Sequence, residues 1–355
     1  MIDQVTQRRI ARTGLTAHNA NRACHGYVLY SSHCKEGKVH LIDLEGHLVH
    51  EWQTPYPVKW AYMLPNGDLF CTARLPAEAR EIILGLETCG ALLEVDWGSN
   101  VVWEHHDRNQ HHDGRRTSNG GALYLIHERI PKEVSSQVKG GIPGADEEGM
   151  WADMLVEVDS SGNRVWEWHA FEHLDFDRHV LPPNVKRNEW SHANSIMPLN
   201  NNRVLVSFRH ISTIAIISKE TGDIVWSIGH ETVSGQHDAS MLANGHILVF
   251  DNGIFRSDMH STFSRVVEIN PSNNTVVWEY RDPWRFSFYS LFISGAQRLA
   301  NGNTLVTDGI FGRMFQVTVD GEVVWEYINP YFGEVDNAVF RARHYLPEEI
   351  PQLLT

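Results

Sequence analysis

The sequence predicts an all-β fold, a six-bladed β-propeller closed by an N-terminal strand that pairs with the last blade. The first observation is a tryptophan element of the Val-Trp-Glu type, which recurs along the 355 residues at Trp52, Trp103, Trp166, Trp226, Trp278 and Trp325. The second is its surroundings: an apolar run and a turn precede each tryptophan, and a second hairpin follows most of them. Copies of four short strands, repeated about every 50 to 60 residues, are typical of a propeller.

The range 236–253 shows this second hairpin in its clearest form. A polar segment with His237 leads into a short strand, the turn Asn244-Gly245 and an apolar strand over 247–250. An Asn-Gly turn between two such runs is a strong hairpin signal. The recurring tryptophans are expected to pack as wedges between neighbouring blades.

The N-terminal run 26–31 resembles the apolar strand at 245–250, whereas the sixth repeat is incomplete at its C-terminal end. Pairing this run with the last blade would close the ring and remove two exposed sheet edges. We therefore expect an N-terminal extension over 1–23, a single propeller domain over 24–350 and a tail over 351–355. Insertions interrupt the period at 129–153, 170–190 and 281–294, and long loops on a rigid scaffold commonly form the binding face.

Composition argues against several functional classes. The net charge of −14 disfavours nucleic-acid binding, which needs a basic surface. The sequence contains no run of about 18 apolar residues, which a membrane-spanning helix would need. The N-terminus also lacks the apolar segment of a signal peptide. We expect a cytoplasmic protein, or a periplasmic one if a signal peptide has been removed. The cysteines, Cys24, Cys34, Cys71 and Cys89, form no C-x-x-C pair and are expected to be idle thiols. Disulfides and the oligomeric state stay open.

When the repeats are aligned, one set of equivalent positions contains candidate functional residues. This column lies seven residues before the Asn of each Asn-Gly turn. Where the turn is longer, the flanking strands are aligned instead. The positions obtained are Lys59, His112, His192, His237 and Ser294. Equivalent positions at the start of the innermost strand face the central channel of a propeller, so these side chains are expected to converge. A second column, across the hairpin, contains Arg74, His127, Arg209, Asn252 and Gly309. Asn194, two residues after His192, points to the same face by strand alternation.

Such a set favours two kinds of chemistry. In one, His112, His192 and His237 hold a divalent transition metal. In the other, a nucleophilic histidine transfers an anionic group while cations and imidazoles stabilise it. Arg209 and Lys59 favour the second, because cations oppose metal binding but attract a sulfate or phosphate. A third possibility, a non-catalytic binding platform, leaves the histidine column unexplained.

The residues around these positions resemble bacterial arylsulfate sulfotransferases. The resemblance rests on Ser191-His192-Ala193-Asn194, Ser207-Phe208-Arg209-His210, Gln236-His237, Phe250-Asp251-Asn252-Gly253 and the closing run Val339 to Tyr345. It implies a six-bladed propeller that passes a sulfuryl group from an aryl sulfate to a phenol without the nucleotide sulfate donor, and no cofactor is expected. It also implies that His237 is transiently sulfated, and that His192, Asn194 and Arg209 bind the sulfuryl oxygens and assist proton transfer.

The same resemblance matches His112 to the remaining pocket histidine, with His111 as the second choice. Lys59, Asn252 and His111 are therefore candidate substrate-binding residues. The known enzymes carry an N-terminal β domain and an export signal, neither of which is expected here, and the chain carries more histidines than the chemistry requires. The alternative of a metal-dependent lyase or oxygenase acting on a phenolic or other small anionic substrate therefore stays open.

Overall fold

The computed structural model describes residues 12–33, 36–81, 88–144, 149–256, 262–284, 287–333 and 336–354. The chain divides into two compact units. The first comprises Met1–Leu69, Val95–Val101 and Ile293–Thr355, and the second comprises Phe70–Glu94 and Val102–Phe292. Each unit is described by itself.

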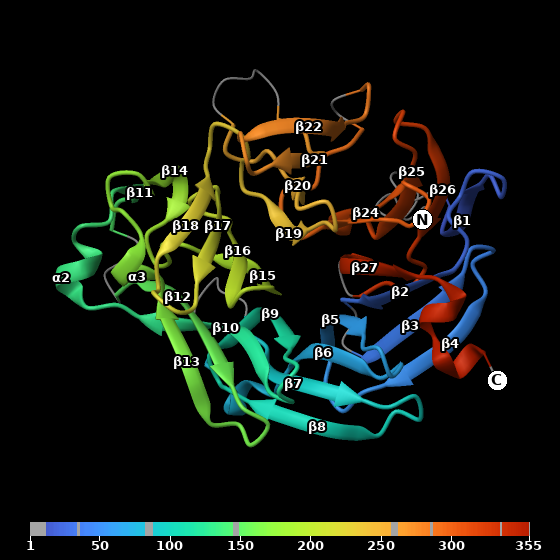
Figure 1. Cartoon of the computed structure of the whole chain (residues 1–355), viewed down its shortest axis with the longest axis horizontal. Coiled ribbons are helices and arrows are strands. Elements are labelled where there is room, and N and C mark those ends of the chain that lie inside the picture. The colour runs from blue at the N-terminus through green and yellow to red at the C-terminus, as the bar shows by residue number, and fades with distance from the viewer. Residues whose placement is uncertain are drawn as a thin grey trace, which may run out of the picture. The chain divides into compact units, whose positions relative to one another are not determined.

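The second unit contains three four-stranded antiparallel sheets (Figure 1). The first has the order β13-β12-β10-β9, with β9 (Gln110–Arg116), β10 (Ala122–Arg129), β12 (Trp151–Val158) and β13 (Arg164–His169). The next is built in chain order from β15 (Ala193–Leu199), β16 (Arg203–Phe208), β17 (Thr213–Ser218) and β18 (Ile224–Ile228). The third is built likewise from β19 (His237–Met241), β20 (Ile247–Asp251), β21 (Arg265–Asn270) and β22 (Thr275–Tyr280).

The first unit contains two further sheets. One has the order β27-β2-β3-β4, with β2 (Tyr27–Ser32), β3 (Lys38–Asp43), β4 (Leu48–Gln53) and β27 (Val339–Tyr345). The other has the order β1-β26-β25-β24-β23, with β1 (Gly14–His18), β23 (Gly295–Arg298), β24 (Thr304–Asp308), β25 (Arg313–Val317) and β26 (Val323–Ile328). A sixth sheet has the order β5-β6-β7-β8, from β5 (Val58–Met63), β6 (Leu69–Arg74), β7 (Gly90–Val95) and β8 (Val101–His106).

Helices are few and short in the described part of the chain. The α-helices α2 (Lys132–Ser135) and α3 (Ala170–His173) span one turn each, and the 3₁₀ turns are Ala77–Ala79, Gly309–Phe311, Pro347–Glu349 and Pro351–Leu353. An all-β chain of six sheets with at least four strands each is a six-bladed β-propeller, which confirms the predicted fold class. No described helix has the length and hydropathy needed to cross a membrane.

The expected closure by an N-terminal strand is present. Strand β2 pairs antiparallel with β27, with Tyr27 opposite Tyr345 and Leu29 opposite Arg343 (Figure 1). Strand β27 thereby completes the sheet of β2, β3 and β4. A second strand, β1, lies within the predicted extension and pairs with β26 as a fifth strand of its sheet. The predicted domain boundaries themselves stay predictions.

The repeated tryptophans connect neighbouring sheets, as the repeat predicts. Four of these indoles donate a hydrogen bond from their N–H group to the outer hairpin of the next sheet: Trp103 to Ser160 O (3.4 Å), Trp166 to Lys219 O (3.1 Å), Trp226 to Asn274 Oδ1 (2.9 Å) and Trp325 to Leu44 O (2.8 Å). The indole N–H of Trp52 is buried and has no hydrogen-bond partner among the described residues. The tryptophan period in the sequence therefore marks the seams between sheets.

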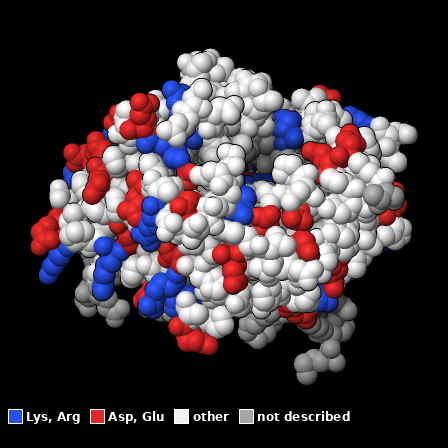
Figure 2. Space-filling model, turned by 60° about the horizontal axis from the view of Figure 1, so that its bottom comes forward, with Lys and Arg blue, Asp and Glu red and all other residues white. Residues whose placement is uncertain are grey.

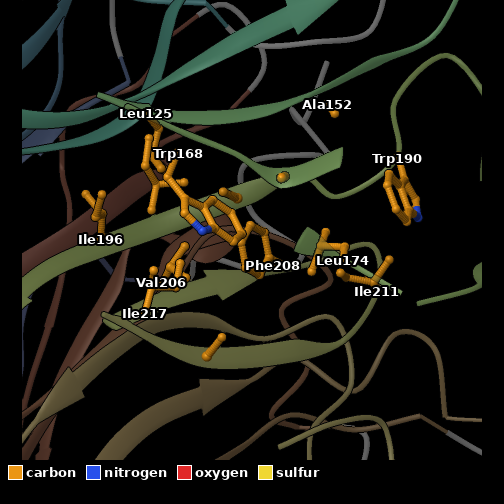
Figure 3. Close-up of a cluster of buried hydrophobic side chains, with 14 of the residues drawn as sticks. Leu125, Ala152, Trp168, Leu174, Trp190, Ile196, Val206, Phe208, Ile211 and Ile217 are labelled. Carbon is orange, nitrogen blue, oxygen red and sulfur yellow. The ribbon is translucent and has the colours of Figure 1, made fainter. Parts of the chain in front are cut away.

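The largest core of the second unit lies between the sheet of β9 to β13 and the sheet of β15 to β18 (Figure 3). Trp168 from β13 and Phe208 from β16 are fully buried there, with ring centroids 6.1 Å apart. Burying such a side chain contributes about 1.5–3 kcal/mol. This packing holds the innermost strands β9 and β15 in a fixed relation.

The first two insertions fold onto each other. Strand β11 (Gly140–Ile142) pairs in parallel with β14 (Leu181–Lys186), and the backbones of Trp151 and Glu189 form a further bridge. The indole of Trp190 donates to His179 O at 2.8 Å. The insertions thereby fix the backbone of Glu189, which lies two residues before the Ser191-His192 motif. Residues 145–148 of the first insertion and 285–286 of the third lie outside the described residues.

Acidic and basic side chains are intermixed on the face drawn in Figure 2. Cys24 and Cys71 are buried free thiols, and Cys89 is also buried, whereas Cys34 lies outside the described residues.

Candidate functional site

The innermost strands of the second unit are irregular where the histidine column falls. The pairing register shifts between His111 and Gly114 in β9, between Ala193 and Ser195 in β15, and between His237 and Ser240 in β19. Beside these bulges, His112, His192 and Asp238 have left-handed φ values of 48°, 54° and 57°. Bulges re-aim side chains next to functional sites, and left-handed non-glycine residues each cost about 1–3 kcal/mol, so the surrounding structure must enforce them.

His237 is held in one tautomer by a short chain of hydrogen bonds. Its Nδ1 lies 2.8 Å from Oδ1 of Asn252, and Nδ2 of Asn252 donates to the Ser290 carbonyl at 2.7 Å. Because the Ser290 carbonyl can only accept, the Asn252 amide must present its oxygen to His237. His237 therefore donates from Nδ1, and in the neutral imidazole the lone pair is on Nε2. All three residues are buried.

His192 forms a dyad with Glu189. Its Nδ1 lies 2.6 Å from Oε2 of the fully buried Glu189, whose other oxygen, Oε1, lies 3.1 Å from Nε2 of His127. The ring of His192 stacks on that of His210, with centroids 4.3 Å apart, and meets the ring of His112 edge-on at 4.7 Å. The Glu189 carboxylate thus pairs with two imidazoles, those of His192 and His127.

His112 and His111 are in contact with each other through their Nδ1 atoms, which are 2.8 Å apart. His111 is fully buried, stacks on His127 with centroids 3.7 Å apart, and lies 3.2 Å from Asp153 Oδ1 through Nε2. That last contact has ion-pair distance but not hydrogen-bond alignment. The two histidines therefore connect the catalytic candidates to a buried carboxylate.

Asn194 joins the site from β15, and Arg209 joins it from the position directly after β16. The Arg209 backbone N–H donates to His192 O at 2.9 Å, and its guanidinium lies over the Phe255 ring at 5.6 Å. Its Nε is buried and has no hydrogen-bond partner among the described residues. Asn194 donates from Nδ2 to the carbonyl of Gln236 at 2.7 Å, which ties β15 to the residue before His237.

Burial dominates the ionisation of these groups. It lowers the pKa of His111 to about 4, lowers the pKa of His210 well below its usual value, and lowers the pKa of Arg209 to about 10. Burial alone would raise the pKa of the Glu189 carboxyl. The charge of His192 and the hydrogen bonds from His127 and His192 instead hold this pKa well below its usual value. Glu189 is therefore ionised, while His111 and His210 are neutral at pH 7.

The second unit thus assembles seven of the eight predicted site residues, namely His111, His112, His192, Asn194, Arg209, His237 and Asn252. Lys59 belongs to the first unit, where its Nζ lies over the Phe340 ring at 4.8 Å. The functional roles assigned to all eight stay predictions. Two groups of potential metal ligands occur among the described residues: His111, His127 and Asp153, and Glu189, His192 and His210. Neither group contains His112 or His237, two of the three histidines expected to bind a metal.

Sequence reasoning missed the two carboxylates of the site, Asp153 and Glu189. Both are fully buried. Asp153 is the charged residue in Trp151-Ala152-Asp153-Met154-Leu155, the start of an otherwise apolar strand, and a charge at such a position is a usable signal. Glu189 follows an irregular insertion, and its placement depends on pairing with the distant Trp151.

The comparisons with known proteins agree with this fold. A protein of unknown function from Bacteroides caccae is 12% identical with a TM-score of 0.57, covering 90% of this chain and 98% of that one. A streptogramin B lyase is also 12% identical, with a TM-score of 0.50 and coverage of 94% and 93%. At these identities the two structures show the fold alone.

A search among curated proteins found no match. The model of the family described as arylsulfotransferase (ASST) matches residues 85–330, which is more than half of the chain and includes every site residue of the second unit. The chain therefore belongs to the arylsulfotransferase family.

Proposed function

We propose that this protein transfers a sulfuryl group from an aryl sulfate to a phenolic acceptor through a transiently sulfated His237. Family membership indicates sulfuryl transfer in general. The donor, the acceptor and the histidine intermediate are the proposal. The observation that carries it is the 2.8 Å contact between His237 Nδ1 and Asn252 Oδ1, which leaves the lone pair of the neutral ring on Nε2.

In the first half-reaction, Nε2 of His237 attacks sulfur, and the bond between sulfur and the aryl oxygen breaks. The departing phenolate takes the Nε2 proton of the His192 imidazolium. Glu189 stabilises that imidazolium, because its carboxylate lies 2.6 Å from His192 Nδ1. The sulfated His237 ring carries positive charge, which strengthens its Nδ1–H bond to Asn252.

In the second half-reaction, the oxygen of a phenol attacks the sulfur on His237, and the nitrogen–sulfur bond breaks. Neutral His192 accepts the phenol proton and returns to the imidazolium form. The donor phenol leaves protonated and the acceptor leaves as its sulfate ester, so no proton is released overall. Imidazole is suited to both steps because its ordinary pKa lies near neutral pH.

Arg209 would neutralise the sulfuryl oxygens during both transfers. Its buried Nε donor has no partner among the described residues, and a guanidinium binds planar arrays of oxygens through two parallel hydrogen bonds. Asn194 and His112 would contact the remaining oxygens. Charge stabilisation of this kind is commonly the largest single contribution to catalysis of group transfer.

The proposal is tested by trapping the intermediate. The protein is incubated with p-nitrophenyl sulfate without an acceptor, and intact mass and peptide mapping locate any sulfuryl group. We expect a burst of p-nitrophenol and sulfation of His237, which a phenol acceptor then removes. His237→Asn should abolish both. The matched control, His246→Asn, alters a histidine of the same hairpin that pairs instead with Glu268. Sulfation of another residue, or turnover by His237→Asn, would overturn the proposal.

A further inference from the structure

Two fully buried carboxylates contact the histidines of the site, and only one of them takes part in the proposed transfer. Glu189 pairs with His192 at 2.6 Å, whereas Asp153, in β12, has no role in that reaction. A buried charge is costly unless its surroundings compensate it. The contacts of Asp153 therefore indicate what its charge does in this protein.

Asp153 divides its two oxygens between two kinds of partner. Oδ2 accepts hydrogen bonds from the Ser191 hydroxyl and from the Ala193 backbone N–H, the latter at 2.8 Å. Oδ1 lies 3.2 Å from Nε2 of His111, without the alignment of an ideal hydrogen bond. At this distance a carboxylate oxygen still attracts an N–H group and repels a nitrogen lone pair. His111 therefore carries its proton on Nε2.

The position of the proton on His111 fixes the position of the proton on His112. Burial lowers the pKa of His111 to about 4, so its ring is neutral at pH 7 and holds a single N–H group. With that proton on Nε2, the lone pair of His111 is on Nδ1. Nδ1 of His112 lies 2.8 Å away and therefore donates to it. In neutral His112 the lone pair is then on Nε2.

The stacked rings behind this contact do not suit a metal ion. The rings of His111 and His127 lie within 11° of parallel, with centroids 3.7 Å apart, so their lone pairs cannot converge on one ion. Oδ1 of Asp153 is also engaged by the N–H group of His111. Because Nε2 of His127 lies 3.1 Å from Glu189 Oε1, the stack instead holds the His111 ring between Asp153 and His112.

We propose that Asp153 and His111 are positioning residues that hold the His112 proton on Nδ1, so that His112 binds an anionic sulfuryl group only as an imidazolium. The second part rests on the proposed function, in which His112 contacts sulfuryl oxygens. A lone pair on Nε2 would repel such an oxygen, whereas a protonated Nε2 donates to it. The added proton comes from solvent, and the Asp153 carboxylate stabilises its charge through His111.

Neighbouring strands also face His112. From β15 the ring of His192 meets it edge-on with centroids 4.7 Å apart, and Glu189 lies behind His192. From β6 the Thr72 hydroxyl donates to the His112 carbonyl at 3.4 Å. A charge on His192 would oppose a charge on His112, because like charges repel. Variants that alter Asp153 and leave His192 and Glu189 unchanged therefore isolate the effect of Asp153.

The substitution Asp153→Asn should reverse both tautomers. The amide oxygen must take the place of Oδ2, because an amide N–H there would face the N–H of Ala193. The amide nitrogen then donates to Nε2 of His111, whose proton moves to Nδ1 and is donated to His112. The His112 proton moves to Nε2, and no second proton can be added at Nδ1 without breaking that contact. The variant thus removes the imidazolium and keeps the size of the side chain.

Nitrogen NMR of protein labelled at histidine reads the tautomers at a pH where His112 is neutral. Signals are assigned with His111→Phe and His112→Asn. We expect Nε2–H on His111 and Nδ1–H on His112 in the parent, and the reverse in Asp153→Asn. Ser191→Ala removes a hydrogen bond from the same carboxylate but keeps its charge, so it should keep the parental tautomers. Reversed tautomers in the parent, or parental ones in Asp153→Asn, would contradict the proposal, and the parent alone decides if that variant does not fold.

Calorimetry tests the imidazolium. The aryl anion p-toluenesulfonate is titrated into the parent and Asp153→Asn in buffers of different ionisation enthalpy. Proton uptake by the parent should be larger by up to about one proton per chain. The affinity of the variant should be about ten- to a hundredfold lower, because it loses a hydrogen bond from a charged donor. Equal uptake would refute the imidazolium. A parent with the expected tautomers that neither binds this anion nor transfers a sulfuryl group would refute the proposed function alone.

Discussion

Replacing Asn252 by Ala tests whether the tautomer of His237 matters for transfer. The substitution removes the 2.8 Å acceptor for His237 Nδ1 and the 2.7 Å donor to the Ser290 carbonyl. A hydrogen bond to a group that becomes charged is worth about 1.5–3 kcal/mol. If that bond forms fully only when His237 is sulfated, kcat should fall by about ten- to a hundredfold. Loss of both hydrogen bonds of the Asn252 amide should lower the free energy of unfolding by about 1–3 kcal/mol.

The two effects are separated by steady-state kinetics with p-nitrophenyl sulfate and phenol, and by urea denaturation. A matched control is Asn329→Ala in the first unit, where the buried amide donates to Asn337 O at 2.8 Å and to Ser32 Oγ at 3.0 Å. It should lose comparable stability and keep its kcat. If Asn252→Ala were destabilised but turned over at the parental rate, the assignment of Asn252 as the group that positions His237 would be wrong.

Three further predictions concern charge, pH and the core. Arg209→Lys should raise KM for the aryl sulfate and lower kcat/KM by about tenfold or more, because an ammonium cannot reproduce the guanidinium fork; equal kinetics would exclude Arg209 from oxyanion binding. Burial lowers the pKa of His40 and of His344 to about 4, so the folded state binds fewer protons than the unfolded state below about pH 6.5. Thermal stability should therefore decrease as the pH falls from about 6.5 to about 4, by up to about 3 kcal/mol per histidine, and His344→Gln should make the decrease shallower. Phe208→Ala should lower the free energy of unfolding by about 3–5 kcal/mol in chemical denaturation, because Phe208 is fully buried against Trp168.

The propeller could be predicted from the sequence because its repeat is local. Most of the tryptophans are followed at similar spacing by a hairpin with the same kind of turn residues. The strands recognised in one copy, such as 236–253, can therefore be placed in the others. The column of His112, His192 and His237 follows from the same register. Repeat alignment places the start of each innermost strand, although it does not show the bulges that give His112 and His192 their left-handed backbone.

The buried carboxylates could not be found in this way, because they do not follow the repeat. Glu189 reaches His192 and His127 only after two insertions pair through Trp151, and this pairing depends on residues far apart in the chain. Asp153 lies opposite His127 in the pairing of β10 with β12, and nothing in the repeat marks that position as a carboxylate. A periodic alignment therefore predicts the imidazoles and misses the groups that set their protonation.

The pairing of β2 with β27 has a consequence for synthesis of the protein in the cell. Tyr27 emerges from the ribosome long before its partner Tyr345. Throughout that interval the hairpins of β2, β3 and β4 present an unpaired strand edge to solvent and to other nascent chains. Contacts between such distant residues also slow folding. We therefore expect a chain shortened before Val339–Tyr345 to keep an aggregation-prone edge rather than to form a smaller stable protein.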